Sequence, residues 1–432
     1  MVDYMEIFSI GEKIKKARID KGYTLKDICD NKISLSKMSC IENDKIPPED
    51  WIIEYISSKL NLDIDYLKCD VKTQIENNIK QIENNKESAE YESRLNYNLA
   101  FALKYKYYNI AFYIMHLLFL HNIENNRIER LQALIPTYYE ISIKSSLEEN
   151  QLKYYMDIGE YLYKFKEYIQ AANYYNIVKK SAYKEKSSYI FAKAILNECK
   201  CYIMLENYEK AYELSEKFLE LDIVNYFKKD IEKAEVYNVF AILNIINMDM
   251  DNFKKYKSIA YDLYGKEMYN KALASYSFAI AMINVNLKDK GVEYIKKSLE
   301  YYPKVDLNKF TEFMIKCLDY IINNNNDIEE VENIINTSID YSNTSIDYSI
   351  KINNLKCIEK SYYYKSILMG KINNIESQEI YMNLSLDVLM KIGNTKDIYK
   401  RYIDLGNMYY KMNNIEESVE YFNLAARLSK KI

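Results

Sequence analysis

The chain has 432 residues, a net charge of −4, and only 8 glycines and 4 prolines. So few turn-forming residues argue against a sheet-rich fold, whereas 49% hydrophobic and 28% charged residues suit a succession of amphipathic helices. The length exceeds what one compact core needs and accommodates a small domain followed by a long array. The negative net charge excludes nucleic-acid binding over the whole surface, so any DNA contact has to come from a local basic face.

Neither a membrane span nor a metal centre is predicted. The most apolar stretch, residues 110–120, is too short to cross a bilayer, and the N-terminus has no secretion-signal pattern. The 7 cysteines form no Cys-x-x-Cys pair, and the two histidines, His116 and His121, belong to no cysteine cluster. We therefore expect a cytoplasmic protein with buried free thiols, no metal and no cofactor.

Residues 1–69 predict five short helices. A first helix ends at the Gly22 stop, and Thr24 and Ser34 are candidate N-caps of a second and a third helix. A fourth helix starts at the breaker that begins with Pro47, and a short fifth helix follows it. A second and a third helix joined by a brief turn make a helix-turn-helix plan.

Three segments in register, residues 10–14, 21–28 and 34–43, resemble the phage-repressor-like helix-turn-helix family, and residues 60–67 also fit. The resemblance implies that the third helix enters the major groove and that its outward residues read bases. It also implies that helix N-termini lie near phosphates. The implied DNA-contacting residues are Thr24, Ser34, Leu35, Ser36, Lys37 and Cys40. Arg18 and Glu42 occupy positions that form a structural ion pair in that family.

The charge of this domain departs from the usual pattern. Residues 1–69 hold 11 basic and 13 acidic side chains, and the predicted recognition helix lacks the Arg or Gln that commonly gives paired contacts to a base. Residues 13–37 nevertheless hold 8 basic and 3 acidic side chains, so a basic face is retained. We expect modest affinity per protomer and a homodimer that binds two half-sites of an operator.

Residues 70–92 are polar and predict a linker helix. Ile75, Ile79 and Ile82 recur at i, i+4 and i+7, which indicates a narrow apolar face, and a flexible piece is expected after it. The expected domains are thus residues 1–69, which bind DNA, the linker at 70–92, and a sensor and dimerisation domain at 93–432.

From about residue 95 the chain repeats itself. Residues 371–376 and 411–416 are near-copies 40 residues apart, and Asn-rich turns at 125–126 and 323–326 follow the same rhythm. Small residues stand where paired helices would cross, with an aromatic residue in the second helix of the pair, as in Gly406 and Phe422. This pattern is typical of tetratricopeptide (TPR) repeats, although the period exceeds their 34 residues. We expect an all-α fold whose second part is a right-handed TPR-like α-solenoid of seven to eight helical pairs.

A seven-residue segment at 336–342 is duplicated at 343–349. Seven residues are about two turns of a helix, so the duplication predicts a longer helix that keeps the same buried face.

A repressor-like helix-turn-helix followed by TPR-like repeats resembles the RRNPP group of peptide-responsive regulators (Rgg, Rap, NprR, PlcR and PrgX). The resemblance implies that a short signalling peptide binds the concave surface of the solenoid and so changes how the paired DNA-binding domains meet their operator. The first helix of each pair would line that surface, where Asn side chains can satisfy the peptide backbone. The peptide-binding candidates are Glu160, Tyr163, Asn238, Tyr276, Asn284 and Asn407.

Two alternatives stay open. TPR arrays also bind proteins, so a protein partner could control the regulator, or no ligand at all. Some members of the resembled group act on response-regulator phosphorylation. We do not predict an enzyme, because the sequence has no Gly-rich phosphate loop, no metal cluster and no nucleophile–base pair.

Overall fold

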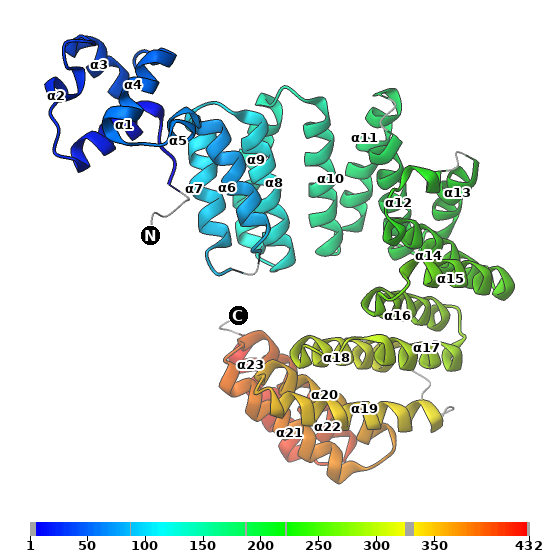
Figure 1. Ribbon diagram of the computed structural model, residues 1–432. Coiled ribbons are helices and arrows are strands. Elements are labelled where there is room, and N and C mark those ends of the chain that lie inside the picture. The colour runs from blue at the N-terminus through cyan, green and yellow to red at the C-terminus, as the bar shows by residue number, and fades with distance from the viewer. Residues whose placement is uncertain (1–5, 87, 186–187, 221–222, 325–331, 430–432) are drawn as a thin grey trace. The chain divides into compact units, whose positions relative to one another are not determined.

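The computed structural model describes residues 6–86, 88–185, 188–220, 223–324 and 332–429. Within these ranges the secondary structure is helical, with no strand, which confirms the predicted all-α class (Figure 1). None of the described helices is long and apolar enough to cross a membrane. The chain divides into two compact units, residues 1–207 and 208–432.

The first unit begins with the five predicted short helices. They are α1 (Ile10–Asp20), α2 (Leu25–Cys29), α3 (Leu35–Glu42), α4 (Asp50–Leu60) and α5 (Ile64–Lys68). Thr24 and Ser34 cap α2 and α3 as predicted, because each hydroxyl accepts a hydrogen bond from the backbone amide three residues on. Ser9 and Glu12 form a reciprocal capping box at the start of α1.

The core of these five helices consists of apolar side chains, most of which are isoleucine. Ile14, Ile28, Met38 and Ile56 are fully buried in it. Gly11 allows α1 to lie directly against α3, since a Cβ at this position would stand 2.2 Å from the Ile41 carbonyl oxygen. The helix-turn-helix unit is therefore held by close backbone approach as well as by apolar burial.

Seven more helices complete the first unit. They are α6 (Val71–Glu83), α7 (Tyr91–Lys104), α8 (Tyr108–Glu124), α9 (Ile128–Lys144), α10 (Glu148–Lys164), α11 (Tyr168–Glu185) and α12 (Ser188–Met204). The narrow apolar face predicted at 70–92 lies on α6, and its Ile75, Ile79 and Ile82 pack into the same core as α7 and α8. This helix is thus part of the helical layer that follows the helix-turn-helix.

The second unit holds the remaining helices. They are α13 (Tyr208–Glu220), the 3₁₀ turn η1 (Ile223–Tyr226), α14 (Asp230–Ile246), α15 (Met250–Tyr264), α16 (Met268–Asn284), α17 (Lys288–Tyr301), α18 (Leu307–Asn324), α19 (Glu332–Lys351), α20 (Leu355–Lys371), α21 (Ile375–Ile392), α22 (Thr395–Lys411) and α23 (Ile415–Ser429). Successive helices pack as pairs from α14/α15 to α22/α23, and the first helices α14, α16, α18 and α20 also contact one another. In the first unit α8/α9 and α10/α11 pack in the same way, so the described residues contain seven such pairs.

The turn between paired helices has a constant geometry. A non-glycine residue with positive φ occurs in the turn of six of these pairs, at Asn126, Lys166, Met248, Asn286, Asn373 and Asn413. Inside the pairs, the aromatic rings of Tyr175 and Phe422 lie directly over Gly159 and Gly406, where a Cβ would stand 2.6 Å from the ring. The predicted crossing of small and aromatic residues is confirmed at both positions. The predicted turn at 323–326 lies largely outside the described residues.

The duplicated segment lies within α19 and keeps one buried face. Ser338 and its copy Ser345 are both fully buried, and so are Ser342 and its copy Ser349. The small side chains allow α20 to approach closely, and the Ser345 hydroxyl donates to the Ser361 hydroxyl at 3.0 Å. The predicted effect of the duplication is confirmed.

Candidate DNA-contacting helix and ligand face

The six predicted DNA-contacting residues lie outside the core of the helix-turn-helix. Thr24, Ser34, Leu35 and Ser36 are exposed, and Lys37 and Cys40 are partly buried. Leu35 is 51% exposed although it is apolar. The first turn of α3 is therefore exposed to solvent, whereas Met38 and Ile41 of the same helix are buried in the core.

Lys37 is held by two neighbours that sequence reasoning missed. Its Nζ lies 2.8 Å from Glu49 Oε1 and 5.8 Å from the centre of the Trp51 ring, and Trp51 Nε1 donates to Glu49 Oε2 at 2.6 Å. The hydrogen bonds from Lys37 and then from Trp51 lower the pKa of the Glu49 carboxyl. The one lysine of α3 is thus neutralised by a carboxylate at the start of α4. In the sequence, Pro47-Pro48 is the feature that could have indicated this contact, because a turn there brings the start of α4 back toward α3.

Arg18 and Glu42 form the ion pair that the family resemblance implied. Arg18 Nε and Nη2 donate to the two Glu42 carboxylate oxygens at 2.7 and 2.9 Å, and Nη1 donates to the Tyr23 carbonyl at 2.9 Å. The Glu42 side chain is 3% exposed. This bidentate contact joins α1, α3 and the turn between α1 and α2, so its role is structural.

The helix-turn-helix is fastened to α6 and α7 by polar contacts. The Gln74 side chain accepts from the Phe8 amide at 3.1 Å and donates to the carbonyls of Phe8 and Cys69 at 2.9 Å. The buried Lys13 ammonium donates to the carbonyls of Tyr66 and Cys69, both at 2.6 Å. One side chain of α6 therefore holds both the segment before α1 and the segment after α5.

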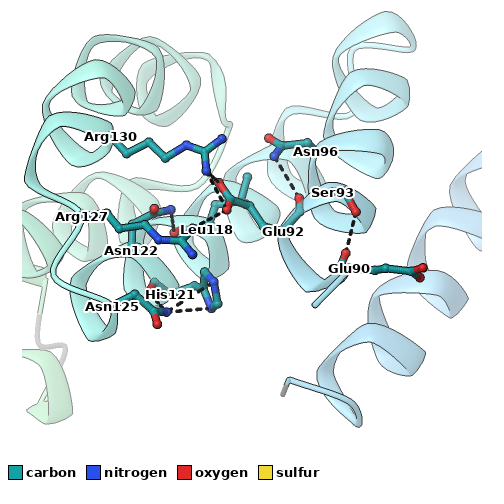
Figure 2. A network of polar contacts seen from close by, with 10 residues as sticks. All are labelled: Glu90, Glu92, Ser93, Asn96, Leu118, His121, Asn122, Asn125, Arg127 and Arg130. Atoms are coloured by element: carbon teal, nitrogen blue, oxygen red, sulfur yellow. Dashed lines mark hydrogen bonds and ion pairs between the residues drawn. The ribbon is translucent and has the colours of Figure 1, made fainter. Parts of the chain in front are cut away.

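A second polar network joins α7 to the start of α9 (Figure 2). Glu92, whose side chain is 17% exposed, accepts hydrogen bonds from Arg127 at 2.6 Å and from Arg130 at 2.9 Å. Beside it, Asn122 donates to the Leu118 carbonyl while its own buried oxygen has no partner in the described part of the chain. The network fixes the first repeat helices against one another, next to the helices that carry the helix-turn-helix.

All six peptide-binding candidates lie on the first helix of a pair, where the repeat pattern predicts them. Glu160 and Tyr163 belong to α10, Asn238 to α14, Tyr276 and Asn284 to α16, and Asn407 to α22. Asn284 and Asn407 are exposed, whereas Tyr276 is buried at 6%. In each unit the candidates thus lie on equivalent helices of their pairs.

Tyr276 and Asn284 are brought together by a residue of α18. The Tyr320 hydroxyl donates to Asn284 Oδ1 at 2.5 Å, and the Tyr320 ring lies 6.3 Å from that of Tyr276. The Tyr276 ring also packs against Phe313 at 5.6 Å, so it forms part of the contact between α16 and α18. Of this pair, Asn284 is the one exposed to solvent.

Asn238 and Glu160 differ in the surroundings of their polar atoms. The Asn238 Oδ1 is buried and has no hydrogen-bond partner among the described residues, although part of its side chain is exposed.

Glu160 is exposed, yet the protein atoms crowded around it raise the pKa of its carboxyl, and the nearby Asp157 carboxylate adds to the shift. Asp157 itself accepts from the Tyr138 hydroxyl at 2.5 Å and contacts the His116 ring nitrogen at 2.5 Å. Tyr163 stacks edge-on against Tyr168 at 5.3 Å.

Among the described residues, no three histidine, cysteine, aspartate or glutamate side chains are arranged to hold a metal ion. All seven cysteines are free thiols. Burial raises the pKa of both Cys199 and Cys201 to about 12, which keeps these thiols protonated.

Several solved structures resemble this chain at low sequence identity. The apo form of RapI is 16% identical with a TM-score of 0.44, over 83% of this chain and 96% of that one. The apo form of the quorum sensor NprR from B. thuringiensis is 15% identical with a TM-score of 0.42, over 83% and 100%. Bacillus thuringiensis PlcR, solved with the peptide PapR7 and DNA, is 15% identical with a TM-score of 0.31, over 89% and 95%.

The names of these structures match members of the RRNPP group that the sequence resembles. No protein-family model matches the chain, and no curated protein sequence does either. Because every one of these TM-scores is below 0.5, the likenesses assign no function to this chain, and function has to be argued from its own residues.

Proposed function

We propose that this chain is a sequence-specific DNA-binding regulator whose activity is controlled by a short signalling peptide bound to the first helices of its repeats. The observation that carries the DNA-binding part is the outward first turn of α3. Ser34, Leu35 and Ser36 are exposed there on a helix whose opposite face is buried in a rigid core. A large apolar side chain left exposed beside two hydroxyls is compatible with contacts to a base edge and to a phosphate.

The basic side chains around this helix supply attraction to the phosphate backbone. Lys15, Lys26 and Lys32 are exposed on α1, on α2 and in the turn before α3. Lys37 is paired with Glu49, so the attraction per protomer is modest. For this reason we propose that the protein binds a two-half-site operator as a homodimer.

The peptide-binding part is supported by the exposed amide chemistry of the first helices. An extended peptide presents backbone N–H and C=O groups that have to be satisfied, and side-chain amides can do so. Asn407 offers an exposed amide, and part of the Asn238 side chain is exposed as well. A ligand lying along first helices could change how neighbouring pairs rotate against one another. The Gln74 contacts provide a rigid path from α6 to the helix-turn-helix.

The test is a mobility shift of the full-length protein with DNA from its own promoter region. Ser36→Glu places a carboxylate on the outward face of α3, and it should weaken binding by about tenfold or more, because the new charge repels phosphates. Ser58→Glu is the matched control, since Ser58 is exposed on α4 outside the predicted recognition helix. If Ser36→Glu shifts DNA as the unmodified protein does, the proposed placement of the recognition helix is wrong.

The peptide and the dimer need separate measurements. Peptide fractions from culture medium, added to the same mobility shift, should strengthen or weaken the complex. Light scattering should give the mass of a dimer with and without DNA. A strict monomer under both conditions would contradict the proposed two-half-site operator.

A further inference from the structure

Four lysines form an exposed group on the first helices of the last two repeat pairs. Lys356 and Lys360 lie on α20, and Lys396 and Lys400 lie on α22. Within each helix the two lysines are four residues apart, so they lie on one face about 6 Å apart along the axis. The two pairs are 40 residues apart in sequence, which is the offset of the internal repeat, so they occupy equivalent positions.

The two helices that carry these lysines are direct neighbours. Arg401 of α22 donates to Glu359 of α20 at 2.6 Å, and its guanidinium lies 3.4 Å from the centre of the Tyr363 ring of α20. Packed helices have axes about 8–10 Å apart. The four lysines therefore lie at equivalent positions on two neighbouring helices, and we call them the lysine quartet.

None of the four lysines of the quartet has an ion-pair partner among the described residues, and the carboxylates nearest to them make their short contacts with other groups. Glu359 is bound by Arg401 and by the Ser385 hydroxyl, Asp404 is bound by Arg401, and Asp397 accepts from the Asn394 amide. Like charges four residues apart on a helix repel each other, and a bound anion would relieve this repulsion.

The surface beside the quartet changes from charged to apolar and amide groups. On the same exposed stripe of α20, Lys356 and Lys360 are followed by Tyr363 and Ile367, which are partly buried. On α22 the lysines are followed by Ile403 and then Asn407, one of the peptide-binding candidates. A ligand that reaches Asn407 would thus meet the quartet within about three helical turns.

We propose that the lysine quartet selects an acidic peptide, with two carboxylate side chains separated by one residue. This inference rests on the proposed function and specifies the ligand's chemistry. In an extended peptide, side chains at i and i+2 lie on one face about 7 Å apart, which is close to the rise of about 6 Å between the two lysines of one helix. Each carboxylate of the peptide would lie between lysines of the quartet. The peptide residues that follow would contact Tyr363, Ile403 and Asn407.

The experiment uses two pools of randomised heptapeptides with two fixed positions that are separated by one residue. Both fixed positions are glutamate in one pool and glutamine in the other. Full-length protein is immobilised, and retained peptides are measured by mass spectrometry. The glutamate pool should be retained about tenfold more than the glutamine pool, the factor that one charge-assisted contact contributes. The difference should disappear in the Lys360→Gln/Lys400→Gln variant.

The matched control is Lys290→Gln/Lys391→Gln, which removes two exposed lysines from second helices, α17 and α21. It should keep the preference for glutamate. Equal retention of the two pools by the unmodified protein would overturn the proposal, and so would an equal loss of preference in the control variant.

The same protein samples are also run in the promoter mobility shift. If Lys360→Gln/Lys400→Gln weakens DNA binding in the absence of peptide, the quartet contacts nucleic acid and the peptide assignment is overturned. If the unmodified protein binds no promoter DNA while the glutamate pool is retained, the proposed function fails and the quartet's ligand chemistry stands. The two failures are therefore distinguishable.

Discussion

Two buried arginine–glutamate pairs, one in each unit, hold helices together in different ways. In the helix-turn-helix, Arg18 makes two parallel contacts to Glu42 and a third to the Tyr23 carbonyl. In the last repeats, Arg401 makes one short contact to Glu359 and a longer one, at 3.2 Å, to Asp404, and its buried Nε has no partner among the described residues. The first arginine is fully satisfied, and the second is not.

The difference indicates where the molecule is rigid and where it can adjust. A bidentate contact fixes both distance and orientation, so α1 and α3 have one arrangement. A buried guanidinium with an unused donor leaves an energetic cost that a small rearrangement could remove. The second arrangement lies beside the lysine quartet, at the place where a ligand would have to shift one repeat pair against the next.

The largest expected effect is the loss of the first pair. Arg18→Met leaves Glu42 buried and unpaired, which should lower the free energy of unfolding of the helix-turn-helix by about 3–5 kcal/mol. Trp51 is the only tryptophan in the chain and lies on α4, so its fluorescence reports on this domain alone. Arg401→Met is the matched control and should leave the tryptophan transition in urea unchanged. An unshifted transition in Arg18→Met would mean that the pair does not stabilise the domain.

A smaller effect should follow from closing the space between α1 and α3. In Gly11→Ala the new Cβ would meet the Ile41 carbonyl oxygen at 2.2 Å and Asp44 Oδ1 at 2.6 Å, and the first of these belongs to backbone that cannot turn aside. The expected loss is about 1–3 kcal/mol in the same tryptophan transition, together with weaker DNA binding. Gly370→Ala in the second unit meets only the flexible side chain of Gln378 and serves as the control. Equal stability of Gly11→Ala and the unmodified protein would contradict the close approach.

The comparison of the two pairs becomes sharper when both partners are replaced. Arg401→Met/Glu359→Leu also leaves the buried Ser385 hydroxyl and the Asp404 carboxylate without their partners, so its thermal stability should recover only a small part of what Arg401→Met alone loses. Arg18→Met/Glu42→Leu should recover more, because the one other group that loses its donor, the Tyr23 carbonyl, belongs to an exposed residue and can bind water. Circular dichroism of the four variants measures this. Equal recovery in both units would remove the distinction between a satisfied and an unsatisfied arginine.

Local features of both units could be predicted from sequence, and features that join distant segments could not. Thr24 and Ser34 were identified as caps because a cap bonds an amide only three residues away. The contact of Gln74 with Phe8 spans 66 residues, and the polarity of Gln74 gives no sign of it. Counting from the repeat anchors placed Tyr276 on a first helix, but the exposed fraction of its side chain depends on Phe313 and Tyr320 of the next pair. The lysine quartet was present in the sequence as a spacing of 40 and was missed because lysine is common on solvated faces.

The smallest expected effect concerns the charge of α3, the proposed recognition helix. Glu49→Gln removes the carboxylate that holds Lys37 and lowers the negative charge beside α3, so promoter DNA should bind a few-fold more tightly, with a steeper dependence on salt. The surface ion pair itself contributes little to stability, so the tryptophan transition should stay unchanged. Glu54→Gln on α4 is the matched control, because Glu54 is exposed and the substitution removes the same negative charge. If both variants gain affinity equally, the gain comes from net charge alone. If only Glu49→Gln gains, then Lys37 contacts DNA once it is released, and the neutral recognition helix becomes a basic one through the loss of a single carboxylate.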